Sequence, residues 1–150
     1  MLKPLNSKSF IVSDVNKLGA TIAEHLSGLL KNHVILIDAP MGAGKTTFVS
    51  SLAALMGSML TPSSPTFSIS NEYPLASPVN GYHQIVHMDL YRFGSIDEIL
   101  QSGIEDYLYD VKNLVLIEWP ELIEPIVVEP FTRMTIEVKE NHWRKFVYLN

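Results

Sequence analysis

One strand–loop–helix pattern limits the fold of this chain more than any other feature. The run HVILID, from His33 to Asp38, has the length and apolar character of a buried strand. The run KTTFVSSLAALM, from Lys45 to Met56, has a helical pattern with Gly57 as its expected end. The letters between and after them, APMGAGKTT, fit the spacing G-x-x-x-x-G-K-[ST] of phosphate-binding loops, except that Ala39 stands at the first position. The sequence therefore predicts a phosphate site between a strand and a helix.

The residue types in this loop explain why it would bind phosphate. Backbone N–H groups at a helix start converge on one point, and the helix dipole adds partial positive charge there. Gly42 and Gly44 permit backbone conformations and a close approach that a Cβ would obstruct. Lys45 is expected to reach the β- and γ-phosphates, and the Thr46 hydroxyl to bind Mg²⁺. The predicted phosphate-binding residues are Gly42, Ala43, Gly44, Lys45, Thr46 and Thr47.

The alternative is an ordinary strand-to-helix turn that contains Gly-Lys-Thr by chance. The strand before the loop and the helix after it favour the phosphate-binding interpretation. Ala39 adds only one methyl group, at the strand end before the loop curls. We therefore expect nucleotide binding to survive this departure from the usual glycine.

A loop of this type needs a carboxylate on a neighbouring strand, which holds Mg²⁺ directly or through water. Glu118 ends LVLIE and Asp89 ends IVHMD, so both are candidates for the carboxyl edge of a sheet, with a solvated strand end as the alternative for each. If both act, one anchors the metal and the other orients a water molecule. Thr66, in SSPTFS, is a candidate loop hydroxyl beside the metal or the γ-phosphate; the alternative is a turn-capping threonine beside Pro65.

His87 and Asp89 lie on one face of the same predicted strand, which raises the alternative of a zinc site. The sequence supplies no evident third ligand and no cysteine. His87 is therefore interpreted as an ordinary strand histidine.

The rest of the chain alternates between helical and strand patterns. Ser13 is expected to cap a helix that runs to about Lys31, and SIDE, from Ser95 to Glu98, has the form of a capping box. A long loop is expected from Leu60 to Gly81, and a strand near TFSISNEY within it is left open. Further strands are predicted at QIVHMDLY, at NLVLIEWP and in a closing hairpin of RMTIEV and RKFVYL. The pattern predicts a single domain, residues 1–150, with an α/β fold: a P-loop NTPase-like mixed β-sheet flanked by helices.

Charge and composition argue against several function classes. Lys plus Arg number 11 and Asp plus Glu number 16, a net charge of −5, whereas a protein that grips nucleic acid by itself carries a basic face. The one basic cluster is small, so tRNA is expected to be contacted only indirectly; its members are Lys139, Arg144 and Lys145. No apolar run approaches the ~20 residues of a membrane span. No signal peptide is recognised and cysteine is absent, which predicts a cytoplasmic protein without membrane contact.

Four segments, GAGKTT, SPTF, HMDLYR and IEWPE, occur in this order along the chain. Together they resemble the bacterial TsaE (YjeE) family over nearly the whole chain, and DLYR and EWPE are the specific parts of the resemblance. The resemblance implies a weak Mg²⁺-dependent P-loop ATPase, required for the threonylcarbamoyl modification of adenosine 37 in tRNA (t6A). It also implies ATP and Mg²⁺ as cofactors, and TsaD and TsaB as protein partners on which activity depends, with TsaD performing the transfer to adenosine.

The resemblance also implies roles for single residues. Gly42 to Thr47 would bind the phosphates, and Thr46 with Glu118 would bind Mg²⁺. Asp89, in HMDLYR, matches a position that the family needs for activity, so Asp89 and Glu118 are the expected catalytic residues. Nucleotide-side roles are implied for the aromatic Trp119 (a core tryptophan being the alternative), the switch-like Thr66 and the late basic Arg144.

Two positions depart from the family's pattern. Ala39 replaces its first glycine, and Val15 stands where a threonine is common, which leaves the contacts to the base open.

Three alternative functions each require features that can be compared with the sequence. A small-molecule kinase closes arginine-bearing lids over two substrates, but Arg92, Arg133 and Arg144 form no recognisable lid. A GTP switch carries an [NT]KxD segment and the glycine of a D-x-x-G segment, and neither occurs here. A non-catalytic nucleotide-dependent adaptor, in which bound ATP sets the affinity for partners, stays open.

Overall fold

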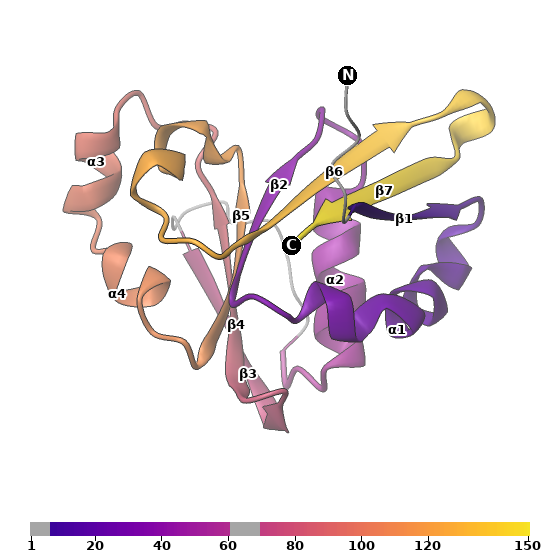
Figure 1. The fold of residues 1–150 in the computed structure, drawn as a ribbon, viewed down its shortest axis with the longest axis horizontal. Coiled ribbons are helices and arrows are strands. Elements are labelled where there is room, and N and C mark those ends of the chain that lie inside the picture. Colours follow the sequence, from indigo (N-terminus) through magenta and orange to yellow (C-terminus); the bar gives the residue numbers. More distant parts are fainter. Residues whose placement is uncertain (1–6, 61–69) are drawn as a thin grey trace.

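The computed structural model describes residues 7–60 and 70–150 of the chain. Their strands form one seven-stranded sheet in the order β1-β7-β6-β2-β5-β4-β3 (Figure 1). In chain order the strands are β1 (Ser7–Val12), β2 (Val34–Asp38), β3 (Ser70–Val79), β4 (Tyr82–Asp89), β5 (Asn113–Glu118), β6 (Thr132–Val138) and β7 (Arg144–Leu149).

The centre of the sheet is parallel and its margins are antiparallel. Strands β6, β2, β5 and β4 run parallel to one another, whereas β3, β7 and β1 are antiparallel to their neighbours. The predicted α/β fold with a mixed sheet is therefore confirmed. Strands β2 and β5 read as the continuous apolar runs VILI and LVLI because central parallel strands are covered on both faces.

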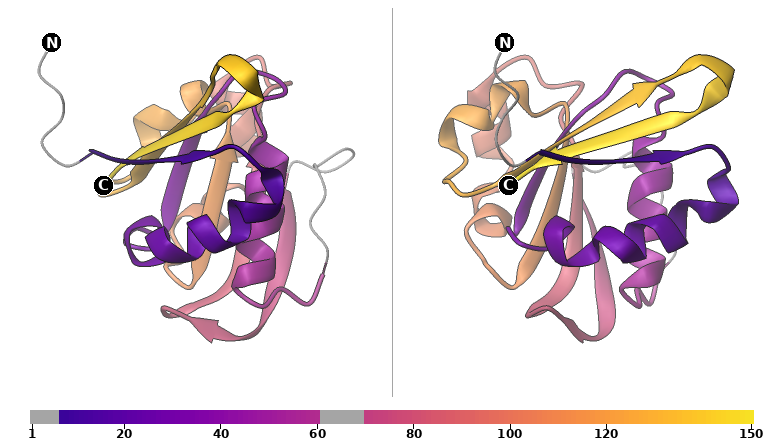
Figure 2. Two further views of the ribbon diagram at one scale, coloured as in Figure 1. Left: turned by 90° about the vertical axis from the view of Figure 1, so that its right-hand side faces the viewer. Right: turned by 45° about the vertical axis from the view of Figure 1, so that its right-hand side comes forward.

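Helices cover both faces of this sheet, as the views in Figures 1 and 2 show. One face carries the 3-10 turn η1 (Val15–Lys17) and the helices α1 (Leu18–Leu29) and α2 (Lys45–Leu55). The other carries α3 (Ile96–Gln101), α4 (Glu105–Leu108) and the turns η2 (Pro120–Leu122) and η3 (Glu124–Ile126), and a further turn, η4 (Glu140–His142), joins β6 to β7.

Alternation along the strands divides the core into two clusters. Ile35 and Ile37 of β2 pack with the residues of α1 and α2, and Val34 and Leu36 pack with those of α3 and α4. A side chain's position along a central strand therefore decides which helices it faces.

The first helix begins later than the sequence predicts. Asp14, not Ser13, is the capping residue, and it caps the 3-10 turn η1, where its carboxylate accepts a hydrogen bond from the Asn16 amide at 3.0 Å. The chain then makes the turn η1, and α1 runs only from Leu18 to Leu29. Serine and aspartate are both favoured caps, so the residue types did not decide between the two positions.

The margins of the sheet also differ from the prediction. Within the expected loop from Leu60 to Gly81, residues Ser70–Val79 form β3, a ten-residue strand that begins inside TFSISNEY, where the sequence leaves a strand open. Its prolines, Pro74 and Pro78, are tolerated because β3 lies at the sheet edge. Strand β1 has no clear signal in the sequence, since SKSFIV is mostly exposed and its pairing partner β7 lies at the other end of the chain.

Other local signals are confirmed. Helix α2 ends before Gly57, whose φ of +82° suits glycine. The Glu98 amide donates to Ser95 Oγ at 3.3 Å, as the capping box requires, although the Glu98 carboxylate accepts from Gly94 instead of Ser95. Strands β6 and β7 form the predicted hairpin. Within the described part of the chain, no helix combines the length and the apolar character that a bilayer-spanning helix requires.

Candidate functional site

The glycine-rich loop follows β2 and leads directly into α2. Gly42 and Gly44 have φ angles of +76° and +107°, which favour glycine, and Gly44 is the N-cap residue of α2. A Cβ on either glycine would meet no atom within 4 Å, so the backbone conformation rather than crowding calls for glycine there. The Phe48 amide donates to the Gly44 carbonyl at 2.9 Å, which starts the helix at the loop. The preceding amides are therefore grouped at a helix N-terminus, the arrangement that binds anions.

Lys45 folds back over this loop. Its Nζ donates to the Ala39 carbonyl at 2.8 Å and lies 3.5 Å from the Pro40 carbonyl. The same ammonium lies 4.4 Å from the centroid of the Trp119 ring, within cation–π range. Trp119 directly follows β5 and has a φ of +55°, which is uncommon for a bulky residue and turns the chain at the end of the strand. The structure thus brings the predicted loop lysine and the predicted aromatic residue together.

Two carboxylates lie at the ends of neighbouring parallel strands. Asp89 of β4 pairs with Glu118 of β5, and Glu118 also lies beside Ile37 of β2, next to the loop. Leu114 and Leu116 of β5 pack with α2, so alternation places Glu118 on the same face of the sheet. Glu118 is 3% exposed. The Asp89 side chain accepts a hydrogen bond from the Tyr91 amide at 3.0 Å.

Asp38 also ends a strand beside the loop, but it belongs to the opposite face. Its carboxylate accepts a hydrogen bond from Arg133 at 2.5 Å, and Arg133 also bonds Glu124 of η3. This network ties β2 and β6 to the turns on the α3–α4 side. Asp38 is therefore satisfied away from the face that α2 covers.

Glu118 has a buried histidine partner. His87 of β4 lies with its Nε2 2.5 Å from Glu118 Oε2, and the His87 side chain is fully buried. The sequence hints at this pair only indirectly. His87 precedes Asp89 by two residues, so both lie on one face of β4, and Asp89 is expected at the same sheet edge as Glu118. Within residues 7–60 and 70–150 no group of three or more His, Cys, Asp or Glu side chains is placed to hold a metal. From the sequence, His87 is interpreted as an ordinary strand histidine, and that interpretation does not include its bond to Glu118.

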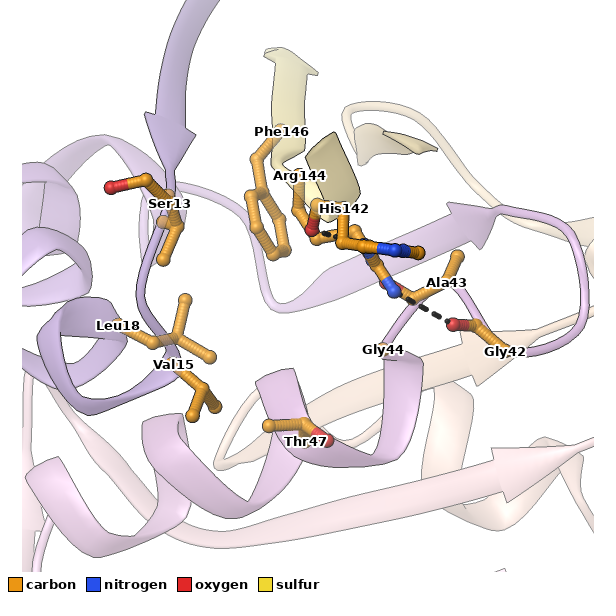
Figure 3. A pocket seen from close by; sticks show the side chains of 11 residues that line it. Ser13, Val15, Leu18, Gly42, Ala43, Gly44, Thr47, His142, Arg144 and Phe146 are labelled. Carbon is orange, nitrogen blue, oxygen red and sulfur yellow. Dashed lines mark hydrogen bonds between the residues drawn. The ribbon is translucent and has the colours of Figure 1, made fainter. Parts of the chain in front are cut away.

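Arg144 of β7 supports the loop from the outside. Its Nε donates to the Ala43 carbonyl at 3.0 Å, and one guanidinium nitrogen lies 3.4 Å from the Gly42 carbonyl (Figure 3). A third bond reaches the His142 carbonyl at 2.5 Å. Residues separated by about a hundred positions in the chain therefore share one hydrogen-bond network.

A pocket of about 250 Å³ opens beside the loop, between the start of α2, the β1–η1 segment and β7. Val15 and Leu18 lie on one side of it and Arg144 and Phe146 on the other, as Figure 3 shows. Thr47, in the first turn of α2, also lines it. A pocket with both apolar and polar lining residues, next to a helix start of the kind that binds anions, suits a flat ring attached to phosphate groups.

The oxygen donors around the loop fit Mg²⁺. This ion prefers oxygen ligands and is commonly held by one or two carboxylates together with the phosphates of a substrate. Thr46 lies in the first turn of α2. Glu118 and Asp89 are the last residues of β5 and β4, on the face of the sheet that α2 covers. The predicted residue Thr66 lies outside the described residues.

The fold and this loop define a P-loop α/β protein. A sequence model of the family described as "Threonylcarbamoyl adenosine biosynthesis protein TsaE" matches residues 12–146. The chain belongs to the TsaE family, as its resemblance to that family predicted. Proteins of this family are named for tRNA threonylcarbamoyladenosine biosynthesis.

Known relatives agree with this assignment. The TsaE protein of Rickettsia conorii is 32% identical over 132 residues, which cover 87% of this chain and 70% of that protein. The TsaE protein of Bacillus subtilis is 35% identical over 106 residues, covering 71% of this chain and 61% of the relative. The crystal structure of YdiB from Bacillus subtilis shares the fold, with a TM-score of 0.67, 20% identity, and coverage of 98% of this chain and 87% of that one.

Proposed function

We propose that the protein binds and slowly hydrolyses MgATP in the cytoplasm, as part of the machinery that forms t6A at adenosine 37 of tRNA together with TsaD and TsaB. The observation that carries this proposal is the loop between β2 and α2, with Lys45 at its mouth and Glu118 and Asp89 on the adjacent strand ends. Family membership supports the place of the protein in t6A formation.

The phosphates of ATP would lie against the amides from Gly42 to Thr47. In the structure the Lys45 ammonium is bonded to the loop's own Ala39 carbonyl. Phosphate oxygens are stronger partners for an ammonium than a neutral carbonyl, so the amine would move from the carbonyl to the β- and γ-phosphates. The movement would be short because the phosphates would be bound by the same loop that contains Ala39.

The nucleoside would occupy the pocket beside the loop. Its apolar walls, including Val15 and Phe146, suit the faces of adenine, and the Arg144 guanidinium lies at its rim. Val15 would supply this contact through its methyl groups, although the family commonly has a threonine there. Thr47 lines the pocket and lies in the first turn of α2, directly after the loop. A nucleotide with its base in the pocket and its phosphates at the loop would therefore pass along this turn.

The two carboxylates would divide the remaining work. Glu118 with the Thr46 hydroxyl would hold the metal, which when bound neutralises charge on the β- and γ-phosphates. Asp89, at the end of the adjacent strand, would orient the attacking water. Thr66 stays a prediction as a hydroxyl that responds to the γ-phosphate.

A line of contacts supports a role in partner binding. The Lys45 ammonium lies against Trp119, and the Trp119 ring lies 5.0 Å from that of Tyr91, which is 54% exposed. A change at the phosphates would therefore reach the surface around Tyr91 and Arg92, which we propose docks on the TsaD–TsaB pair. The net charge of −5 supports contact with tRNA through those partners and not by this chain alone.

The decisive experiment reconstitutes t6A formation with TsaD, TsaB and tRNA, with this protein, without it, and with Lys45→Ala. We expect no modification without the protein or with the variant, because Lys45→Ala removes the phosphate-binding ammonium. Modification that proceeds equally well in all three reactions would overturn the proposed function.

Turnover measurements separate catalysis from adaptor function. ATP hydrolysis should be slow for the protein alone and rise when TsaD and TsaB are added. Glu118→Ala and Asp89→Ala should retain most nucleotide binding and lose turnover. If both variants lost turnover yet supported full t6A formation, the adaptor alternative would replace the enzymatic one, and phosphate transfer to a metabolite would indicate a kinase.

A further inference from the structure

The buried contact between His87 and Glu118 is expected to lower folding stability relative to an apolar side chain at position 87. His87 is fully buried, and its second ring nitrogen, Nδ1, has no hydrogen-bond partner among the described residues. Its neighbours on the same face of the sheet, Ile85 and Leu116, belong to an apolar cluster that an aliphatic side chain would extend. A buried polar group without a full set of partners lowers stability, and an apolar replacement is often neutral or favourable. Folding stability alone therefore does not explain why a histidine occupies position 87.

The hydrogen-bond partners specify how the imidazole is protonated. A carboxylate only accepts hydrogen bonds, so the His87 Nε2 donates its proton to Glu118 Oε2. The opposite assignment, with a Glu118 hydroxyl donating to Nε2, leaves a buried N–H at Nδ1 with no acceptor among the described residues. Unpaired buried N–H groups are rarer than under-used acceptors. The contact thus corresponds to the Nε2–H tautomer, with an unprotonated Nδ1.

The main chain around Glu118 is also fixed. The Leu90 amide donates to the Glu118 carbonyl at 3.1 Å, and Trp119 turns sharply in the left-handed region immediately afterwards. The backbone is therefore held on both sides of the side chain, and the bond at its tip further fixes the orientation of the carboxylate. His87 supplies that bond from the neighbouring strand.

We propose that His87 is a positioning residue: it holds Oε2 of Glu118 and reserves the other carboxylate oxygen for the metal and phosphate side of the site. This inference rests on the proposed function, because it gives Glu118 the metal-binding role assumed there. Groups that orient a metal ligand in this way typically change metal affinity or activity by roughly 10- to 100-fold when they are removed.

The test compares two substitutions at position 87. In His87→Gln a side-chain amide N–H can still reach the Glu118 carboxylate, whereas His87→Leu keeps the bulk and removes the donor. Mn²⁺ affinity is measured by electron paramagnetic resonance on the complex with a non-hydrolysable ATP analogue, and kcat is measured separately. We expect His87→Leu to lose roughly tenfold or more in both quantities, and His87→Gln to recover most of each.

His33 provides a matched control. It precedes β2 at the end away from the loop, and its Nε2 bonds the Leu108 carbonyl at 2.8 Å. His33→Leu also removes an imidazole hydrogen bond and should change stability in urea, but not Mn²⁺ affinity. An equal loss of affinity in this control and in His87→Leu would mean that general destabilisation, not positioning, is responsible.

A double-mutant cycle shows whether His87 acts through Glu118. In a Glu118→Gln background, adding His87→Leu should cause no further loss of Mn²⁺ affinity, because the group that His87 positions is already altered. Independent, multiplicative losses would overturn the proposal. Nitrogen NMR of the wild-type imidazole provides a test that needs no variant to fold: a proton on Nδ1 instead of Nε2 would overturn it as well.

Different outcomes would exclude nucleotide binding and the role of His87. If the wild-type protein bound neither the ATP analogue nor Mn²⁺ with it, the proposed function would fail and this inference with it. If the wild type bound both and His87→Leu bound them equally well, only the positioning role would be wrong.

Discussion

Ala39 stands where phosphate-binding loops usually begin with glycine. Its carbonyl accepts from Lys45 at 2.8 Å, an interaction that any residue offers, and its methyl group packs against the core. Ala39→Gly should therefore change ATP affinity by less than roughly threefold and lower the free energy of unfolding by about 1 kcal/mol, because glycine is more flexible in the unfolded chain.

Titration with a fluorescent ATP analogue and urea unfolding check this prediction. If Ala39→Gly converted a non-binding protein into a binding one, the native loop would not be a nucleotide site, contrary to the proposed function.

Arg144 contributes geometry as well as charge. Its guanidinium reaches the carbonyls of Ala43 and Gly42 together, and a lysine ammonium lacks the planar fork that spans both. Arg144→Lys should therefore weaken ATP binding about tenfold, equivalent to about 1.4 kcal/mol. Lys145→Ala removes the adjacent cation as a control. Retained ATP affinity in Arg144→Lys would show that only the charge of the side chain matters. An equal loss of affinity in Lys145→Ala would indicate that the overall positive potential near the loop is responsible, and not the geometry of Arg144.

At the scale of elements, α1 contains two glycines in different surroundings. A Cβ at Gly19 would meet no atom within 4 Å, whereas one at Gly28 would lie 2.9 Å from the Tyr148 hydroxyl. Tyr148 is buried, and its hydroxyl bonds His25 at 2.9 Å, so the ring has little freedom to move. Gly19→Ala should stabilise the protein by roughly 0.5–1 kcal/mol through helix propensity, while Gly28→Ala should destabilise it by about 1 kcal/mol.

Urea unfolding of both variants measures the difference within one helix. Equal stabilisation by the two substitutions would show that Tyr148 moves aside at no cost, and would refute the packing argument.

The elements that the sequence predicted well are those whose signals are local. Strand β2, helix α2 and its end before Gly57 depend on an apolar run, a glycine turn and a cap within about two dozen residues. Strand β1 lacks such a signal and β3 has only the weak one in TFSISNEY, because an edge strand is half exposed and takes its identity from the partner it pairs with. The first helix begins later than its signals indicate because Ser13 and Asp14 are equally good caps and because the 3-10 turn η1 precedes α1.

At the scale of the whole molecule, binding of MgATP should raise the free energy of unfolding and therefore the Tm. A ligand that binds only the folded state adds about 2.7 kcal/mol when it is present at 100 times its dissociation constant. For a chain of this size, that corresponds to an increase in Tm of roughly 5–10 °C with MgATP. EDTA should remove more than half of the increase, since Glu118 and Thr46 then face the triphosphate without a cation.

Differential scanning fluorimetry makes this measurement, with Lys45→Ala as the control that should show no increase. A wild-type Tm that ignores both MgATP and EDTA would contradict binding at the loop.

The sequence by itself determined that a strand, a glycine-rich turn and a helix meet at a phosphate-binding loop, because the needed conformations and groups lie within a few residues of one another. It also supplied the two candidate carboxylates Asp89 and Glu118, and Asp38 at the end of the strand before the loop, without showing the surroundings of any of them. Only the tertiary structure decided that Asp38 faces Arg133 on one side of the sheet while Glu118 meets His87 on the other. Strand order and side-chain parity set those contacts, and they depend on pairings between distant segments that no local pattern contains.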